Sequence, residues 1–258
     1  MGMPAALRVT EYRLVAYRRV WHGSALVTFV NPVLFLLAMG LGVGSLVDAN
    51  DPNSLAGQEY VTFLAPGLLA ATAMQVGSTE ATWPIMSSIK WVPVAFAQVA
   101  TPMSPGHIAV GQLVFIGMRL AMSAIAFAVV MALFGVVGSW WVVAAVPAAI
   151  LTGLAFNAPI MAWSVTLDRA SLYPLLQRFV IMPMFLFSGT FFPVAQLPAV
   201  VRPIAYVTPL WHGVRLCRTL TLGTADPLEA LGHASLLVAI ATTGLAVAVR
   251  NYDRRLRP

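Results

Sequence analysis

Hydrophobic residues are gathered into long runs along this chain, and short polar segments separate them. A helix that crosses the hydrocarbon core of a bilayer, about 30 Å thick, needs about 20 apolar residues. Five runs reach that length, and a sixth is interrupted near its start by Gln177 and Arg178. The predicted spans are residues 25–47, 60–82, 120–138, 142–166, 172–192 and 231–249. The alternating pattern of a membrane β-barrel is absent from the sequence. The pattern therefore predicts an all-α integral membrane protein with six transmembrane helices.

Residues 5–22, ahead of the first span, have the pattern of an amphipathic helix in the membrane interface. Leu7, Leu14 and Trp21 can enter lipid, whereas the arginines of the segment can face the head groups. A disordered basic tail is the alternative.

The segment 84–107 is interrupted by four prolines and is too irregular to cross the membrane, but it is apolar and Lys90 is its only charged residue. An exposed apolar surface of this kind marks an interaction site. We predict a cytoplasmic segment that docks on another protein, and packing against the rest of the chain is the alternative.

Residues 193–229 contain five prolines and no apolar run of spanning length. The spacing of apolar residues over 197–205 predicts one short amphipathic helix. A second should begin at Pro209, because proline is favoured in the first helical turn, and should continue to about Leu222. We predict a re-entrant helical hairpin between the fifth and sixth spans that caps the outer side, since irregular backbone at membrane depth needs protein to cover it. A loop on the outer surface is the alternative.

Composition and charge support the membrane assignment and orient the chain. Of the 258 residues, 59% are hydrophobic and 9% charged, whereas soluble domains carry roughly 25% charged residues. The net charge of +6 comes from arginines clustered before the first span and after the last, while 48–59 has acidic residues and no basic ones. Because positive charge stays on the cytoplasmic side, both termini are predicted to be cytoplasmic, which requires an even number of spans. The charge is thus topological and does not indicate binding to nucleic acid.

Arg119 decides where the third span begins. In the middle of a membrane helix an arginine costs roughly 2.5–3.5 kcal/mol on insertion scales. We therefore expect Arg119 at the inner interface, with 104–118 as an amphipathic lead-in. An intramembrane ion pair with Glu80 is the alternative.

No sequence motif indicates catalysis or metal binding. Residues 106–111 have the glycine spacing of a phosphate-binding loop, but Gln112 and Leu113 follow in place of the lysine and hydroxyl that the chemistry needs. Cys217 is the only cysteine, which excludes an internal disulfide, and the four histidines are far apart in sequence, so we expect each to be an interfacial or packing residue. Gly40 and Gly44 form a small-residue face suited to close helix contact, in a dimer or otherwise.

The run 184–198, Met-Phe-Leu-Phe-Ser-Gly-Thr-Phe-Phe-Pro-Val-Ala-Gln-Leu-Pro, is followed by Pro209-Leu210 and Arg215. Together with Thr-Pro-Met-Ser-Pro at 101–105, then Ile108 and Gly111, it resembles the ABC-2 type exporter permeases. The resemblance covers nearly the whole chain, as one transmembrane domain over 1–258. It is closest to permeases that export nodulation lipo-oligosaccharides, and more distant relatives export polysaccharides or drugs.

This resemblance implies a permease in the bacterial cytoplasmic membrane, working as a homodimer or with a paralogue. Two separate ATPase subunits would bind ATP and magnesium, and this chain would bind no cofactor itself. The coupling helix would fall at about 86–100, with Trp91, Phe96 and Val99 as docking residues.

The segment after the fifth span would be the outer gate, beside a path for an amphipathic substrate among membrane lipids. The candidate gate residues are Phe187, Phe191, Phe192 and Trp211. Position 112 is a glutamine in this chain, whereas relatives often have a carboxylate there. A salt bridge between this position and Arg119 can therefore be inferred from the relatives only weakly.

Two other classes of function are weighed against this one. A secondary transporter would need ionisable residues in the middle of the membrane and typically repeated halves. A membrane-embedded enzyme would need polar residues clustered at one depth. The sequence shows neither pattern.

Overall fold

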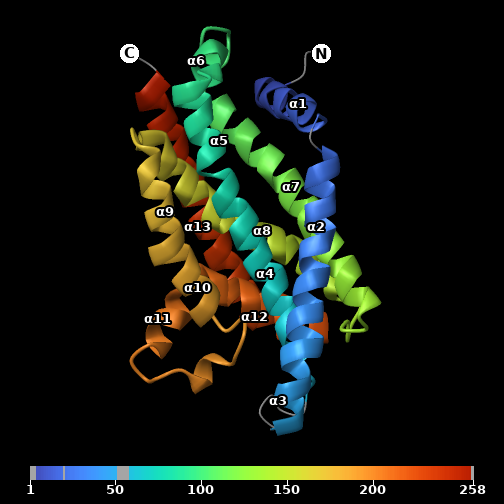
Figure 1. The fold of residues 1–258 in the computed structure, drawn as a ribbon. Coiled ribbons are helices and arrows are strands. Elements are labelled where there is room, and N and C mark those ends of the chain that lie inside the picture. The colour runs from blue at the N-terminus through green and yellow to red at the C-terminus, as the bar shows by residue number, and fades with distance from the viewer. Residues whose placement is uncertain (1–3, 20, 51–57, 257–258) are drawn as a thin grey trace.

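The computed structural model describes residues 4–19, 21–50 and 58–256, and these ranges consist of helices and the segments that connect them (Figure 1). Six helical stretches are long and apolar enough to cross a membrane: Trp21–Leu46, Tyr60–Trp91, Pro105–Leu133, Val142–Thr166, Ala170–Phe187 and Pro227–Leu256. The predicted all-α fold with six spans is confirmed. Residue 20 of the predicted interface helix and residues 51–57 of the acidic segment lie outside the described ranges.

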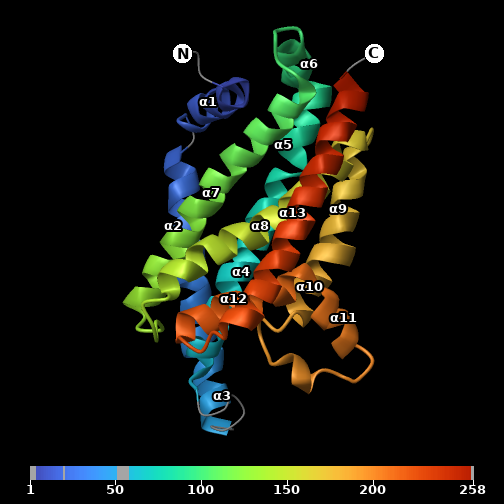
Figure 2. The ribbon, with the colours of Figure 1, turned by 180° about the vertical axis from the view of Figure 1, so that it is seen from behind.

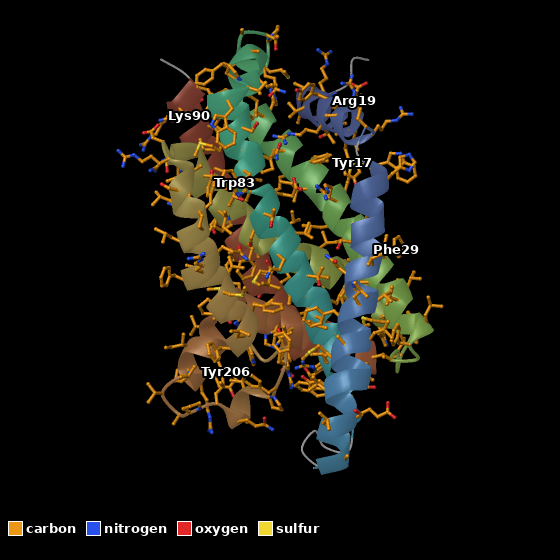
Figure 3. The ribbon with its side chains drawn as sticks, in the orientation of Figure 1. Tyr17, Arg19, Phe29, Trp83, Lys90 and Tyr206 are labelled. Atoms are coloured by element: carbon orange, nitrogen blue, oxygen red, sulfur yellow. The ribbon has the colours of Figure 1, made fainter. Side chains whose placement is uncertain are left out.

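Both termini lie at one end of the bundle, beside α6 (Val94–Val99) (Figures 1 and 2). We call this the terminal end. The opposite, distal end carries α3 (Gly44–Asn50) and α11 (Arg202–Val207). Figure 3 shows Arg19 and Lys90 at the terminal end and Tyr206 at the distal end.

Charges from three segments meet at the surface of the terminal end. Asp168, between the fourth and fifth spans, accepts from Lys90 Nζ at 2.8 Å and from Arg255 Nη2 at 2.5 Å. Hydrogen bonds from these two cations lower the pKa of Asp168 to about 2. The carboxylate therefore stays ionised and connects the ends of the second and sixth spans at neutral pH.

The N-terminal helix α1 (Ala5–Tyr17) forms within the predicted 5–22 segment and packs against α7 (Pro105–Leu133). The predicted extent to residue 22 is wrong, because Trp21 begins the first helix of the first span. The Thr10 hydroxyl donates to the carbonyl of Gly111 at 3.0 Å. A Cβ added to Gly111 would overlap the carbonyl oxygen of Ala6, so only glycine allows this approach. The alternative of a disordered basic tail is therefore wrong for the described part of the segment.

The first span is built from α2 (Trp21–Leu36), a π-helical segment (Leu37–Val43) and α3. A Cβ at Gly40 would come within 2.8 Å of Val61 Cγ2, and one at Gly44 within 3.7 Å of Tyr60. The small-residue face predicted at these glycines therefore contacts the second span of the same chain.

The second span continues beyond the predicted end near Pro84. It consists of α4 (Tyr60–Glu80), α5 (Trp83–Met86) and a π-helical segment (Ser87–Trp91). The helix is interrupted at Thr82, whose φ is −105° and ψ −94°. Pro84 occupies the first turn of α5, where its missing N–H leaves no hydrogen bond unmade. Lys90 and Trp91 therefore lie on a helical extension of the span and not in an irregular loop.

The third span is one uninterrupted helix, α7, which begins at Pro105. Ser104 caps it, because the N–H of His107 donates to the Ser104 hydroxyl at 3.4 Å and Ser104 N–H donates back to His107 Nδ1 at 3.2 Å. The prediction that the span starts at Leu120, with 104–118 as a separate lead-in, is wrong. Arg119 lies midway along the helix.

The fourth span, α8 (Val142–Thr166), is the centre of the bundle and packs against α4, α7, α12 (Pro209–Leu222) and α13 (Pro227–Leu256). It crosses α4 where two glycines meet, and a Cβ on Gly77 would overlap the carbonyl oxygen of Gly153. The Asn157 amide also donates to the carbonyl of Gly77 at 2.8 Å. Small residues and polar side chains are the usual means of bringing membrane helices close together.

The fifth span consists of short segments: Ala170–Leu172, α9 (Tyr173–Leu176), a π-helical segment (Gln177–Ile181) and α10 (Met182–Phe187). Only 11% of this span is buried in the single chain, against 72% of the second. It ends at Phe187, short of the predicted limit at 192.

A short 3-10 turn (Val194–Gln196), α11 and α12 follow the fifth span. The predicted bounds of the second short helix, Pro209 to Leu222, are confirmed by α12. The first predicted helix, over 197–205, is wrong in extent, because α11 forms only from Arg202, with Pro203 in its first turn.

Candidate functional site

The predicted ATPase-docking residues lie at the tip of the terminal end. Trp91 is 57% exposed and stacks on Trp83 with ring centroids 5.9 Å apart, and Phe96 on α6 is 43% exposed. Val99 is half-buried and packs against the main core. The structure thus leaves two of the three side chains open to a partner, and their role in docking stays a prediction.

Glu80 and Arg119 form an ion pair between α4 and α7. The Glu80 side chain is 12% exposed and that of Arg119 25%. The Arg119 guanidinium also lies 5.0 Å from the centroid of the Tyr17 ring on α1. The structure contains the pairing with Glu80 that was the alternative, and the placement of Arg119 at the inner interface stays a prediction. The pair offsets the cost of an arginine midway along a membrane helix.

A groove of about 640 Å³ opens between the first span, α4, α7 and α10. Its walls are mostly apolar and include Phe35, Leu68, Phe127 and Phe185. We call it the lateral groove. Pockets that bind small molecules commonly have roughly this volume, 300–1,000 Å³, and this mostly apolar character.

A few polar side chains face the same groove: Asn31 from α2, and Thr72 and Gln75 from α4. Gln75 Oε1 accepts a hydrogen bond from Gln177 Nε2 of the fifth span at 3.2 Å. The lateral groove can therefore cover an apolar chain along most of its length and offer hydrogen bonds to a polar group at one level. Sequence reasoning missed these residues, although glutamines inside apolar runs were a usable signal.

The four predicted gate aromatics do not form one cluster. Phe191 packs edge-on against Phe185 at 5.0 Å between centroids and lies 6.3 Å from Phe35, which places it beside the lateral groove. Phe187 is 43% exposed. Phe191 therefore contacts two of the residues that line the groove.

Phe192 and Trp211 pack instead into a second, smaller apolar cluster around Val194, Leu197 and Ala205. The chain turns into this cluster at Gly189, whose φ of +82° is a left-handed conformation that favours glycine. Trp211 also packs edge-on against Tyr206 at 4.9 Å. The distal segment is thus a small packed unit of its own.

Arg218 on α12 ties this distal unit to the bundle. Its Nη2 donates to the carbonyl of Gly189 at 2.9 Å, its Nε donates to the carbonyl of Phe63 at 3.1 Å, and the guanidinium lies 3.8 Å from the Phe63 ring centroid. Any movement of the Gly189 turn away from α4 must break these contacts. Sequence reasoning missed this residue.

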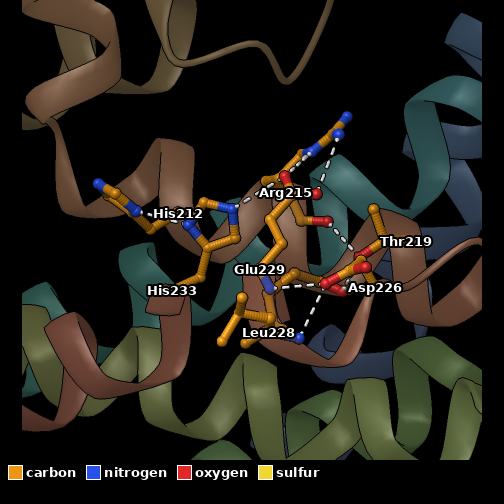
Figure 4. A network of polar contacts seen from close by, with 8 residues as sticks. His212, Arg215, Thr219, Asp226, Leu228, Glu229 and His233 are labelled. Atoms are coloured by element: carbon orange, nitrogen blue, oxygen red, sulfur yellow. Dashed lines mark hydrogen bonds and ion pairs between the residues drawn. The ribbon is translucent and has the colours of Figure 1, made fainter. Parts of the chain in front are cut away.

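A polar network joins α12 to the start of α13 (Figure 4). The Nδ1 atoms of His212 and His233 are 2.8 Å apart, so one ring must donate and the other accept. Glu229 accepts from Arg215 Nε at 2.8 Å and lies 3.4 Å from His233 Nε2. The pKa of His212 is lowered by burial and by His233. The two histidines lie far apart along the chain, so the sequence did not indicate that they pair. Arg215 is one of the residues that follow the run 184–198 in the family resemblance.

The polar clusters lack the arrangement of a metal centre. Among the residues that the structure describes, no group of three or more His, Cys, Asp or Glu side chains could hold a metal ion. Residues 106–111 lie at the start of α7, and no strand precedes them in the described chain. That this chain binds no cofactor of its own stays a prediction.

Comparisons with known proteins agree with this architecture. The family described as ABC-2 type transporter matches residues 7–222. Nodulation protein J of Rhizobium meliloti (strain 1021) is 28% identical over 253 residues, which is 98% of this chain and 94% of the relative. Nodulation protein J of Rhizobium leguminosarum bv. viciae is 29% identical over 217 residues, 84% of this chain and 82% of the relative.

Proposed function

Because the chain belongs to the ABC-2 type transporter family, we propose that it is the permease subunit of an exporter driven by a separate ATPase. The observation that carries this proposal is the match of the family over most of the chain, joined to a six-span bundle with an exposed apolar tip at α6. The chain is a transport subunit, and ATP hydrolysis belongs to its partner.

The terminal end is the proposed site of energy coupling. Trp91 at the last residue of the second span and Phe96 just after it present apolar surface, which an isolated subunit would expose to water. Trp91 lies on the helical extension of the second span, so a displacement at the tip would reach α4 through α5 and the break at Thr82. Nucleotide binding can change the balance between two conformational states of the permease only if the ATPases bind those states with different affinity. The size of the change is set by that difference in affinity. Two ATPase subunits would serve two permease chains.

We propose that the substrate is amphipathic: a lipid-linked saccharide, a lipid or a hydrophobic drug. The lateral groove supports this class, because its apolar walls suit acyl or ring systems while Asn31, Thr72 and Gln75 can bind a polar group. A polar group buried without such partners would cost several kcal/mol. The relatives are named Nodulation protein J, and the resemblance to permeases of nodulation lipo-oligosaccharides favours a lipid-linked saccharide within this class.

Orientation and assembly follow from charge and exposure. Arginines gather at the terminal end, so we place that end and both termini in the cytoplasm, with the chain in the bacterial inner membrane. The distal unit then lies outside and acts as the gate, with Phe191 between it and the lateral groove. The little-buried fifth span offers a surface for a second permease copy or a paralogue.

The coupling hypothesis is tested by replacing Phe96 in the full chain, co-expressed with its ATPase. Phe96→Asp should abolish co-purification and permease-dependent ATPase activity, because a carboxylate cannot enter an apolar contact without losing its hydration. Phe96→Leu is the matched control and should retain both. The thermal unfolding midpoint of each variant reports whether the permease stays folded.

Unchanged co-purification and ATPase activity in a folded Phe96→Asp variant would exclude α6 as the coupling element. Trp91→Ala tests the neighbouring residue in the same way, since it removes exposed apolar area and leaves charge unchanged. For the substrate, lipid identification by mass spectrometry of the purified complex should recover an amphipathic molecule that Gln75→Leu reduces.

A further inference from the structure

A second cavity, of about 360 Å³, lies at the terminal end where α1, α6, α7 and α13 approach the helical extension of the second span. We call it the terminal cavity. Its polar lining is made of one cation and several neutral side chains, and no Asp or Glu belongs to it: Tyr12, Arg13, Ser87, Ser88, Gln98, Gln112 and Tyr252. Its apolar walls include Val9 and Ile108. It is separate from the lateral groove and shares no residue with it.

Arg13 is the only charged group in this lining. Within the described ranges it makes no hydrogen bond or ion pair. Burial lowers the pKa of Arg13, against the opposing effects of Tyr252 and Glu80. The carboxylate of Glu80 is already engaged by Arg119. An arginine stays charged in proteins, so this guanidinium loses hydration and forms no direct ion pair with a carboxylate of the described residues.

A second donor in the lining also lacks a partner. Gln112 is 1% exposed, and its Nε2 has no hydrogen-bond acceptor in the described structure. Buried polar groups are normally hydrogen-bonded, and each exception requires an explanation. Tyr252 of α13 lines the same cavity, and its hydroxyl is a third donor there. The three donors thus come from α1, α7 and α13 and line one cavity.

We propose that the terminal cavity binds a phosphate group, either on the head group of an anionic phospholipid or as free phosphate. A guanidinium binds phosphate through strong charge-assisted hydrogen bonds. A phosphate presents several acceptor oxygens in different directions, which suits donors that come from three helices. The bound anion would fix α1 relative to α7 and α13, beyond the contacts that Thr10 makes with Gly111.

The test uses the full-length chain in nanodiscs, with binding read from the thermal unfolding midpoint and from native mass spectrometry. One arm compares phosphatidylglycerol with phosphatidylcholine nanodiscs, and the other adds inorganic phosphate to phosphatidylcholine nanodiscs. Arg13→Gln should weaken binding about tenfold or more, as expected for one lost charge-assisted hydrogen bond. Arg8→Gln is the matched control, because Arg8 lies on the same helix but is exposed.

A second variant distinguishes loss of phosphate binding from loss of folding. Gln112→Glu adds a carboxylate to the same lining as Arg13, so it should abolish phosphate binding while keeping or raising the unfolding midpoint in phosphatidylcholine. Binding only in phosphatidylglycerol identifies the lipid head group as the ligand, and binding of inorganic phosphate as well identifies phosphate itself. Equal losses in Arg8→Gln and Arg13→Gln, or no binding in either arm, would overturn the proposal. These measurements involve neither transport nor an ATPase. A negative result would therefore refute phosphate binding without bearing on the proposed function.

Discussion

Replacing Arg119 with leucine tests whether the Glu80–Arg119 pair holds α4 and α7 together. The change leaves the Glu80 carboxylate, only 12% exposed, without its cation. Breaking a buried ion pair by removing one partner costs about 3–5 kcal/mol. We expect a loss near the lower limit, ~3 kcal/mol, because the Arg119 side chain is 25% exposed and water can partly replace it.

The double variant Glu80→Leu/Arg119→Leu distinguishes the ion pair from simple loss of packing. With both charges gone, no uncompensated carboxylate remains, and replacing a whole buried pair by apolar residues is often neutral or stabilising. The double variant should therefore be at least ~2 kcal/mol more stable than Arg119→Leu alone. The coupling energy is the change in the double variant minus the changes in Arg119→Leu and in Glu80→Leu, the fourth member of the cycle. Tyr17→Leu is the control for the contact with the ring on α1, and it should cost only about 0.5–1 kcal/mol.

The measurement is the free energy of unfolding of the purified chain in mixed micelles with increasing denaturing detergent, for all four members of the cycle. If the losses of the two single variants simply add in the double variant, the two side chains are not coupled. The pair would then have no part in joining α4 to α7, and the explanation for an arginine midway along α7 would be refuted.

Three further predictions concern other parts of the bundle. Gly77→Val should destabilise the chain by about 1–3 kcal/mol or more, because its side chain would meet the backbone of Gly153 at the crossing of α4 and α8; unfolding in detergent checks it, and an unchanged midpoint would contradict the crossing. His212 has a lowered pKa, so its stabilising effect is present above its ordinary pKa of 6.5 and is lost as pH falls below it; His212→Gln should flatten the fall in the unfolding midpoint between pH 7 and 5. A cysteine at Gln196, in the 3-10 turn before α11, should react with an impermeant thiol reagent from outside intact cells, and labelling only from the cytoplasmic face would reverse the topology.

Much of the fold follows from local pattern. The six spans and the bounds of α12 could be predicted because apolar length and the preference of proline for a first helical turn are properties of a short stretch of chain. The errors fell where a local rule was overridden. Pro84 was expected to end the second span, but it lies in the first turn of α5 and the helix continues to Trp91.

The sequence by itself determined that this is a helical membrane protein and to which family it belongs. It also predicted that both termini lie on the same side of the membrane, and it predicted which residues could contact an ATPase. Only the tertiary structure decided which polar groups face one another. Glu80 meets Arg119, and His212 meets His233, because helices far apart in sequence pack side by side at one depth. Arg13, in contrast, forms no ion pair with a carboxylate in the described structure, whereas Arg119 and Arg255 do. Nothing in the sequence distinguishes these arginines. The packing between segments decides which side chains are buried and which polar groups form hydrogen bonds or ion pairs. The periodic pattern along a single segment does not contain this information.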